Sequence, residues 1–411
     1  MSHPFTQAQV NSYLPIFQEQ ANKLRDMIKD LLEHPVPNEK DVRDEWTVVE
    51  VAGWLSRTTL DIIGLAGFSH SFGALDNTNN KLGTAFAVLL HPPKLTSLTI
   101  ILQLLTAYIP VLVNIPTRQA KNAKAAMEIM EGEGRKMVQI RKEWAENGEL
   151  DDKIDLMSLL VKANLNVLNK KDKMLDVELM GQVATFIMAG HDTSSTTVAW
   201  ILMYMSTRPE IQKKLREEVQ RAKAKAATED RSELKHEEIS SLPYMDAVVK
   251  ETLRCVPPVL EWLLKPLAIF LKVLLQIHDY SRYSARRSVM IGISSFNRTK
   301  TIFGEDAHEF RPERWLEKEI DDGLQLAKGF TTLSPLLTFL GGPRGCIGYR
   351  FALLEVKTIL ATLIAAFEFL ERDEGGTPLT MRSTIVTRPV VIGEENLGPR
   401  LPLRVRKVAQ V

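Results

Sequence analysis

Cysteine, net charge and long uncharged runs are all scarce in this chain of 411 residues. Only Cys255 and Cys346 are present, which excludes a disulfide framework and favours a reducing compartment. The formal net charge is +1, from 52 basic and 51 acidic residues, so no overall field indicates a nucleic-acid partner. The remaining composition, 45% hydrophobic and 25% charged, is that of a globular protein, and the length is typical of a large enzyme.

The longest uncharged run, residues 95–117, has the length to span a bilayer. Polar residues and the prolines Pro110 and Pro116 dilute this run. We therefore expect a buried helix or a surface that rests on a membrane rather than a spanning helix. The first seven residues, Met-Ser-His-Pro-Phe-Thr-Gln, have the features of neither a signal peptide nor a membrane anchor, so no anchor is expected in this chain.

Hydrophobic periodicity predicts a mainly α fold. Helices are predicted over 8–33, 46–68, 82–114 (broken at its prolines), 117–147, 151–162, 176–207, 210–225, 243–255 and 349–369. Strand signals cluster late, over 289–294, 385–391 and 401–405. The expected architecture is a single domain over residues 1–411. It has a helical body over about 1–258 and 345–370 and a small β portion over about 288–344 and 371–411.

One cysteine lies in a glycine-rich loop, Phe339-Leu-Gly-Gly-Pro-Arg-Gly-Cys-Ile-Gly348, directly before a predicted helix. A helix N-terminus favours a thiolate, and a cysteine thiolate can hold haem iron. The alternative is a small buried cysteine at a turn. Residues of these types at these spacings arise by chance on the order of once in ten thousand chains. We therefore interpret Cys346 as the iron ligand within a cofactor-binding set made of Phe339, Gly342, Arg344, Cys346 and Gly348.

The predicted helix 176–207 is apolar on both sides of a polar notch that runs from Gly190 to Thr197. A helix that is apolar all round is buried, and buried polar groups are costly without partners. Gly190 costs roughly 1 kcal/mol relative to alanine, and serine or threonine side chains can bend a helix. Ala189 and Thr193 share a face with Gly190. The notch indicates a site, and helix–helix packing is the alternative interpretation.

Two charged motifs follow, Glu251-Thr-Leu-Arg254 and Phe310-Arg-Pro-Glu-Arg314-Trp. A surface ion pair three residues apart contributes only about 0.2–0.5 kcal/mol and is common, so neither motif is specific alone.

Together and in this order, the motifs resemble those of the cytochrome P-450 family. The cysteine loop resembles the haem-binding signature, and the notch resembles the oxygen-activation motif. The resemblance implies that Thr193 hydrogen-bonds iron-bound oxygen, that Asp192 helps to relay protons, and that Ala189 and Gly190 lie at the cofactor. His191 occupies a variable position and is assigned no role.

The same resemblance assigns Glu251, Arg254 and Arg314 to a buried charge triad that holds the scaffold of the cysteine loop. Removal of one partner would strand a buried charge at a cost of several kcal/mol.

The resemblance implies a haem-thiolate monooxygenase that inserts one oxygen atom of O₂ into a lipophilic organic substrate. The implied cofactor is haem b, with electrons from NADPH through a separate reductase that docks near Arg344 and Arg350. The likeness is to eukaryotic microsomal and especially fungal members, which implies the endoplasmic reticulum membrane. One alternative is a haem-thiolate isomerase or dehydratase, but the presence of Asp192 and Thr193 argues against it because such enzymes usually lack the proton relay. A second alternative is a haem-poor relative that does not turn over substrate.

Two departures from the family pattern remain. No Trp-x-x-x-Arg sequence precedes Trp46, so an N-terminal sheet portion and a helix that contacts the haem are expected to be missing. Residues 259–287 are aberrant, because Leu260–Gln276 is apolar and helix-like where the family has strands and polar turns. A mis-spliced transcript or a faulty gene model would explain both features, and a genuine short paralogue is the alternative. The expectation is a truncated member whose haem pocket lacks part of its wall.

Overall fold

The computed structural model describes residues 5–35, 46–77, 80–90, 118–150, 155–167, 169, 173–264, 289–317, 332–333, 335–373, 376–383 and 385–408. Its α-helices are α1 (Gln7–Ser12), α2 (Leu14–Glu33), α3 (Val51–Phe68), α4 (Lys81–Leu90), α6 (Arg118–Glu146), α7 (Leu156–Leu165), α8 (Asp176–Ser206), α9 (Pro209–Thr228), α10 (His236–Ser240), α11 (Pro243–Cys255), α13 (Ile293–Asn297), α14 (Lys300–Phe303) and α16 (Tyr349–Ala366). Its strands are β1 (Thr47–Glu50), β2 (Glu261–Leu264), β3 (Val289–Gly292), β4 (Phe367–Glu371), β5 (Leu379–Ser383), β6 (Thr387–Val391) and β7 (Pro402–Lys407).

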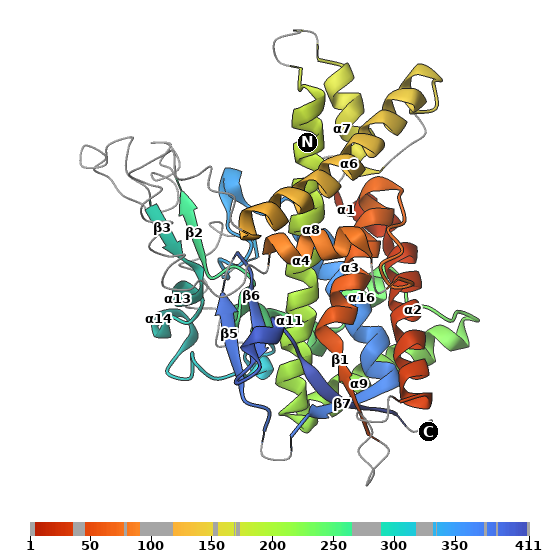
Figure 1. The fold of residues 1–411 in the computed structure, drawn as a ribbon. Helices are drawn as coiled ribbons and strands as arrows, with labels where there is room; N and C mark the ends of the chain where they lie inside the picture. The colour runs from red at the N-terminus through yellow and green to blue at the C-terminus, as the bar shows by residue number, and fades with distance from the viewer. Residues whose placement is uncertain are drawn as a thin grey trace.

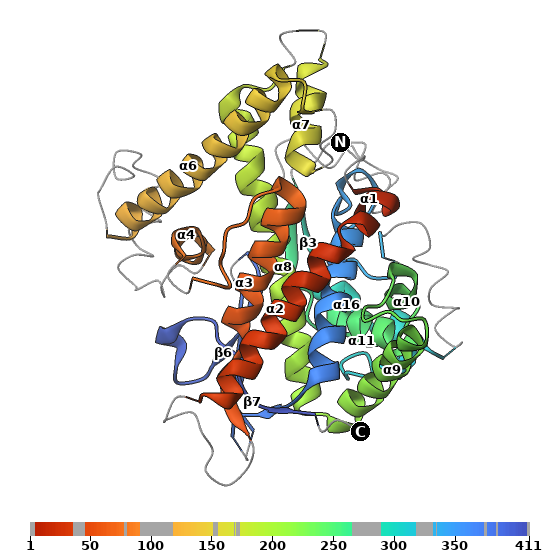
Figure 2. The same ribbon diagram turned by 90° about the vertical axis from the view of Figure 1, so that its right-hand side faces the viewer.

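Helix α8 runs through the centre of the helical body (Figure 1). Helices α3 and α16 flank it, and α2 lies against both of them (Figure 2). The second half of α8 is buried on every side from His191 to Leu202 except at Thr193, which is half-buried. This burial follows from the apolar residues that surround the notch, because a helix that is apolar all round has no face for water.

The described strands form three small antiparallel sheets. Strand β7 lies between β1 and β4, with Val49 opposite Leu403 and Phe369 opposite Val405. These four side chains are buried under the helical body. Strands β5 and β6 form a hairpin beside α8, and β2 pairs with β3.

The mainly α class and most of the predicted helices are confirmed, including the long helices now seen as α6 and α8. The prediction of one helix over 46–68 is wrong at its start, because Thr47–Glu50 pairs with β7 as strand β1. Residues 367–369 were likewise expected in a helix and belong to strand β4. Both errors have one cause: pairing with a strand distant in sequence outweighs local helix periodicity.

Two further predictions concern apolar segments. Within Leu260–Gln276 the helix-like interpretation is wrong for Glu261–Leu264, which forms β2 opposite β3, and the rest of that segment lies outside the described residues. The helix predicted over 82–114 is seen as α4 up to Leu90. The uncharged run 95–117 also lies outside the described residues. Of the helices that are described, none combines the length and the apolar character needed to cross a bilayer.

Candidate functional site

The cysteine loop and the notched helix meet at one cavity, named here the Cys346 cavity. Helix α8 contributes Ala189, Thr193, Ser194 and Thr197, and α16 contributes Ala352, Leu353 and Val356. The remaining lining is Val249, Leu253, Pro258, Val259, Ile293, Thr338, Phe339, Leu340, Arg344 and Cys346. The enclosed space is about 250 Å³, just under the range of about 300–1,000 Å³ typical of small-molecule sites. Residues that lie far apart in the sequence therefore meet at one small cavity.

Backbone hydrogen bonds close the cysteine loop. The N–H of Cys346 donates to the carbonyl of Phe339 at 2.8 Å, and the N–H of Gly345 donates to Gly342 at 3.0 Å. Gly342 has φ +60°, a left-handed conformation that favours glycine. A Cβ on Gly345 would lie 2.6 Å from the hydroxyl oxygen of Thr332. Two of the loop glycines are therefore required by the fold of the loop itself.

Cys346 is an exposed residue as a whole, but its thiol is largely covered where it lines the cavity just before α16, which Gly348 caps. Burial raises the pKa of the Cys346 thiol, and a hydrogen bond from the backbone of Gly348 opposes that rise. The protein alone therefore favours the neutral thiol. A bound metal would reverse this preference, because coordination deprotonates a thiol.

The residues that line the Cys346 cavity can be tested for their fit to a bound metal or haem. Among the described residues no group of three or more His, Cys, Asp or Glu side chains could hold a metal ion. A porphyrin iron needs only one axial ligand from the protein, and Cys346 supplies one thiol. The rest of the lining is largely apolar, and the exposed Arg344 is its one charged side chain. These residues fit a flat apolar macrocycle with anionic propionates.

Thr193 and Ala189 lie on the wall of the Cys346 cavity, as their shared helix face predicted. The Thr193 hydroxyl donates to the carbonyl of Ala189 at 2.8 Å, and Thr197 donates back to the carbonyl of Thr193 at the same distance. A hydroxyl held by its own helix can rotate to serve a group in the cavity. The catalytic role of Thr193 stays a prediction.

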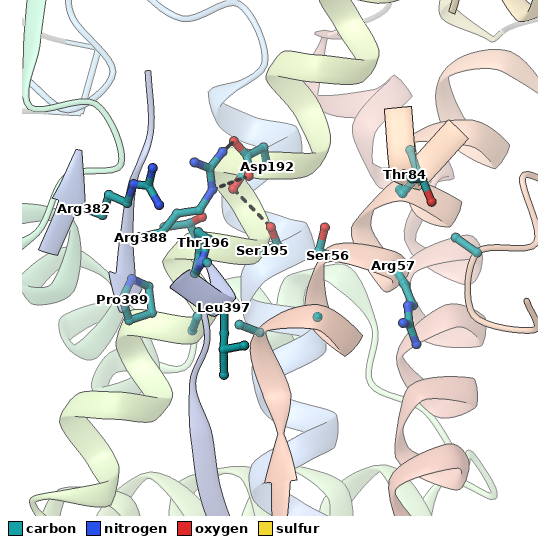
Figure 3. Close-up of a pocket in the computed structure, with 18 of the residues that line it drawn as sticks. Ser56, Arg57, Thr84, Asp192, Ser195, Thr196, Arg382, Arg388, Pro389 and Leu397 are labelled. Atoms are coloured by element: carbon teal, nitrogen blue, oxygen red, sulfur yellow. Dashed lines mark hydrogen bonds and ion pairs between the residues drawn. The ribbon is translucent and has the colours of Figure 1, made fainter. Parts of the chain in front are cut away.

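Asp192 lies on a different side of α8 from Thr193. Its carboxylate pairs with Arg388 of β6, with the Nε of Arg388 3.0 Å from Oδ1 and an Nη2 contact to Oδ2. Both side chains are buried, and they point toward one another at a second cavity (Figure 3). The proton-relay role of Asp192 stays a prediction. Arg388 was not predicted, because no local pattern links positions 196 residues apart.

Gly190 faces α3 and is not among the residues that line the Cys346 cavity. A Cβ at this position would lie 2.9 Å from Cδ1 and 3.1 Å from Cγ1 of Ile63. Beside it, the hydroxyl of Thr59 donates to the carbonyl of His191 at 2.8 Å. Burial lowers the pKa of the His191 imidazole, which favours the neutral ring. The notch thus combines both interpretations, with packing at Gly190 and His191 and a cavity wall at Ala189 and Thr193.

The charges of Glu251, Arg254 and Arg314 meet in the interior, with side chains 0%, 0% and 2% exposed. The Arg254 Nη2 lies 2.8 Å and the Arg314 Nε 3.0 Å from Oε1 of Glu251. The carboxylate also accepts hydrogen bonds from the Arg311 N–H at 2.8 Å and from the Trp315 indole at 2.9 Å. Every charge of the triad is therefore partnered, which is the condition for burying it.

Asn297 connects this triad to the cysteine loop. Its backbone carbonyl accepts from Arg254 at 3.3 Å. Its side-chain oxygen accepts from the Leu337 N–H at 2.9 Å, and its amide nitrogen lies 2.9 Å from the Thr338 hydroxyl oxygen. Because Leu337 and Thr338 directly precede Phe339, the contacts support the predicted scaffold role. Asn297 itself carried no sequence signal.

Glu355 of α16 is a further buried group beside the cavity. It is 0% exposed, and among the described residues neither oxygen has a hydrogen-bond partner of good geometry. Burial raises the pKa of the Glu355 carboxyl to about 8, against a smaller opposing effect of the Ser194 hydroxyl. The sequence did contain a signal, because Glu355 is the one acidic residue in α16 and lies within a mostly apolar stretch.

A model of the cytochrome P-450 family matches residues 1–392. The chain belongs to the cytochrome P-450 family. It is 36% identical to cytochrome P-450 monooxygenase 205 of Postia placenta over 99% of this chain and 74% of that protein. It is 28% identical to a ganoderic acid synthetase of Ganoderma lucidum over 98% of this chain and 75% of that protein. The crystal structure of a cytochrome P-450 shares the fold, with a TM-score of 0.69, 22% identity, and coverage of 99% of this chain and 77% of that one.

Membership in the cytochrome P-450 family confirms the expected class of enzyme, a monooxygenase, and implies haem as its cofactor. The relatives named above are fungal, which confirms that expectation too. The division of the chain into one domain and the roles of individual residues stay predictions.

Proposed function

We propose that this cytochrome P-450 inserts one oxygen atom of O₂ into a lipophilic organic substrate, with electrons from NADPH delivered by a separate reductase. The observation that supports the proposal is the meeting of Cys346 and Thr193 at one largely apolar cavity. The two residues are remote in sequence and were selected by independent motifs. Haem, when bound, supplies the activation of O₂ that side chains alone cannot provide.

The cysteine loop would hold the haem. Cys346 would provide the thiolate that holds the iron, while Gly342 and Gly348 shape the loop around it and Phe339 forms part of the wall. The guanidinium of Arg344 would pair with a propionate. Ala189 of α8, a small side chain on the cavity wall, would leave room for the cofactor.

Thr193 and Asp192 of α8 would take part in proton transfer to groups bound in the Cys346 cavity. The Thr193 hydroxyl would turn from the Ala189 carbonyl into the cavity and donate a hydrogen bond there. Asp192 is held by Arg388 at the second cavity, so its carboxylate would have to reorient to exchange a proton with a group in the Cys346 cavity. Proton delivery would then depend on how firmly Arg388 holds Asp192.

The cavity lining and the exposed arginines near Cys346 suggest the substrate class and the reductase contact. Apolar lining residues such as Leu253, Val259 and Leu353 favour a lipophilic substrate. Arg344 and Arg350 are exposed at the cysteine side and would face an acidic patch of the reductase. Family members of this kind act at the endoplasmic reticulum membrane, where we propose that this chain acts as well.

Turnover with isotopically labelled O₂ tests the proposal. Purified protein reconstituted with haem, a fungal reductase and NADPH should produce an oxygenated product that carries one labelled atom by mass spectrometry. Cys346→Ser should lose this product, whereas Cys255→Ser should keep it because Cys255 lies outside the Cys346 cavity. Absence of NADPH-dependent product from haem-loaded protein, or oxygen derived from water, would refute the proposal.

A further inference from the structure

A second cavity of about 900 Å³ lies on the side of α8 that carries Asp192, and we name it the Arg57 cavity. Helices α3, α4 and α8 form one part of its wall, and the β5–β6 hairpin with the following turn at 395–399 forms the other (Figure 3). None of its lining residues belongs to the Cys346 cavity. Its volume falls within the range of about 300–1,000 Å³ in which small organic ligands bind.

The charges that line the Arg57 cavity do not balance. Its lining contains three arginines, Arg57, Arg382 and Arg388, and two carboxylates, Asp192 and Glu395. Arg388 and Asp192 neutralise one another in their buried ion pair. One positive charge is therefore in excess at the cavity wall.

Among the described residues, no counter-charge pairs with Arg57 of this cavity. Its guanidinium lies over the Trp54 ring at 4.7 Å. Within the part of the chain that is described, it makes neither an ion pair nor a hydrogen bond, and it is half-buried. A half-buried arginine with unused donors favours an anionic partner, because charge-assisted bidentate hydrogen bonds are among the strongest polar contacts. The neighbouring Ser56 adds a hydroxyl to the same wall.

The rest of the Arg57 cavity is suited to an apolar body. Leu60 and Ala199 are buried on α3 and α8, and Pro389 and Leu397 line the facing wall. Leu397 is 56% exposed, which is a large apolar surface for a side chain with no partner to cover it. The combination of one uncompensated arginine and apolar walls defines an amphipathic ligand.

We propose that the Arg57 cavity binds a lipophilic carboxylate. The carboxylate would pair with Arg57 and the hydrocarbon would lie along Leu60, Ala199 and Leu397. The site is separate from the Cys346 cavity and does not require haem, so it goes beyond the monooxygenase function and is tested independently of it.

Calorimetric titration of the purified full chain with decanoate, below its micellar concentration, tests the charge requirement. Saturable binding of one decanoate per chain is expected, with decanol at least about tenfold weaker because it lacks the charge. Arg57→Gln should weaken decanoate binding about tenfold, and Arg57→Lys should weaken it less, because lysine keeps the positive charge but loses the bidentate geometry. Arg208→Gln is the matched control, since Arg208 also stacks on an aromatic ring, that of Tyr204 at 5.5 Å, but lies outside the cavity.

Two matched substitutions locate the bound decanoate. Ser56→Phe places an aromatic ring on the wall beside Arg57 and should weaken binding strongly, whereas Ala189→Phe places one in the Cys346 cavity and should leave binding unchanged. The reverse pattern would place decanoate in the Cys346 cavity and overturn the proposal. Absence of saturable binding, equal binding of decanol and decanoate, or an Arg57→Gln variant that binds like the unmodified chain would each overturn it as well.

Discussion

The buried carboxylate of Asp192 is paired with the guanidinium of Arg388, and the pair holds Asp192 on a different side of α8 from its neighbour Thr193. Adjacent helix residues point about 100° apart, so one turn of α8 can serve two cavities. A strand residue from the C-terminal hairpin thereby controls the position of a carboxylate in the central helix. Any use of Asp192 in proton transfer would depend on this contact.

The effects of substituting Asp192 and Arg388 on the free energy of unfolding should be strongly non-additive. Arg388→Gln leaves a buried carboxylate without its charge partner and should lower the free energy of unfolding by about 3–5 kcal/mol. Asp192→Asn in the same chain should restore part of that loss, because no charge is then stranded. Urea unfolding of the two single variants and the double variant measures the coupling. Strictly additive losses would contradict the account. Lys142→Gln, in the exposed pair with Asp176, should change stability by less than about 1 kcal/mol.

Removal of the Glu251 charge from the triad should lower the free energy of unfolding. Glu251→Gln leaves the buried guanidinium of Arg254 without its carboxylate partner, whereas Arg314 keeps Asp306 at 3.1 Å. We expect a loss of about 3–5 kcal/mol in the free energy of unfolding, measured by chemical denaturation. Glu305→Gln is the comparison, since Glu305 is 88% exposed in its pair with Lys300. A loss from Glu251→Gln no larger than that from Glu305→Gln would show that the triad does not hold the interior together.

Glu355 should make stability depend on pH. Its pKa in the folded chain is about 8, raised by burial from an ordinary value of 4.5. Between these values the folded chain retains a proton that the unfolded chain has lost. The stability is therefore fully present below about pH 4.5 and declines toward pH 8, by up to about 1.4 kcal/mol per pH unit.

Glu355→Gln should remove this decline. The unfolding free energy of the variant minus that of the unmodified chain should therefore become more positive from pH 5 to pH 8. Other titrating groups contribute equally to both proteins and cancel in the difference. A difference that stays constant across this range would mean that Glu355 ionises as an ordinary carboxyl.

Substitution of Gly190 distinguishes two roles for this residue, packing against Ile63 of α3 and contact with the haem. Gly190→Val would force its side chain into Ile63 of α3 and should destabilise the chain by about 1–3 kcal/mol. Ile63→Ala in the same chain should recover part of that loss instead of adding to it. Gly132→Val is the control, because a Cβ at this glycine of α6 would have no neighbour within 4 Å. No recovery by Ile63→Ala, together with weaker haem binding, would place Gly190 at the cofactor instead.

The sequence predicted well what is set by local pattern. Helix α8 was expected over 176–207 and ends at Ser206, because its long apolar stretch and the Arg208-Pro209 stop are both local features. The cysteine loop was likewise identified from residue types at fixed spacings, whereas the triad was assigned only through the family resemblance. Their meeting in space could be expected only through the family resemblance.

What the sequence could not reveal depends on pairing between distant segments. Strand β1 reads as the start of a helix until β7 pairs with it. Arg388 and Asn297 have no local features that mark them, although each connects elements that the site needs. Asp192 and Thr193 also looked like one functional unit, but adjacent helix residues point about 100° apart and Arg388 of the hairpin holds Asp192 at the other cavity.

The most direct test of the account is the carbon-monoxide difference spectrum of the reduced, haem-supplied protein, recorded beside Cys346→Ser. The account predicts the band of a thiolate-ligated haem in the unmodified chain and its loss in Cys346→Ser, with Cys255→Ser unchanged. The same band in Cys346→Ser, or no such band in an unmodified chain that has been supplied with haem, would contradict the central claim that Cys346 is the axial ligand.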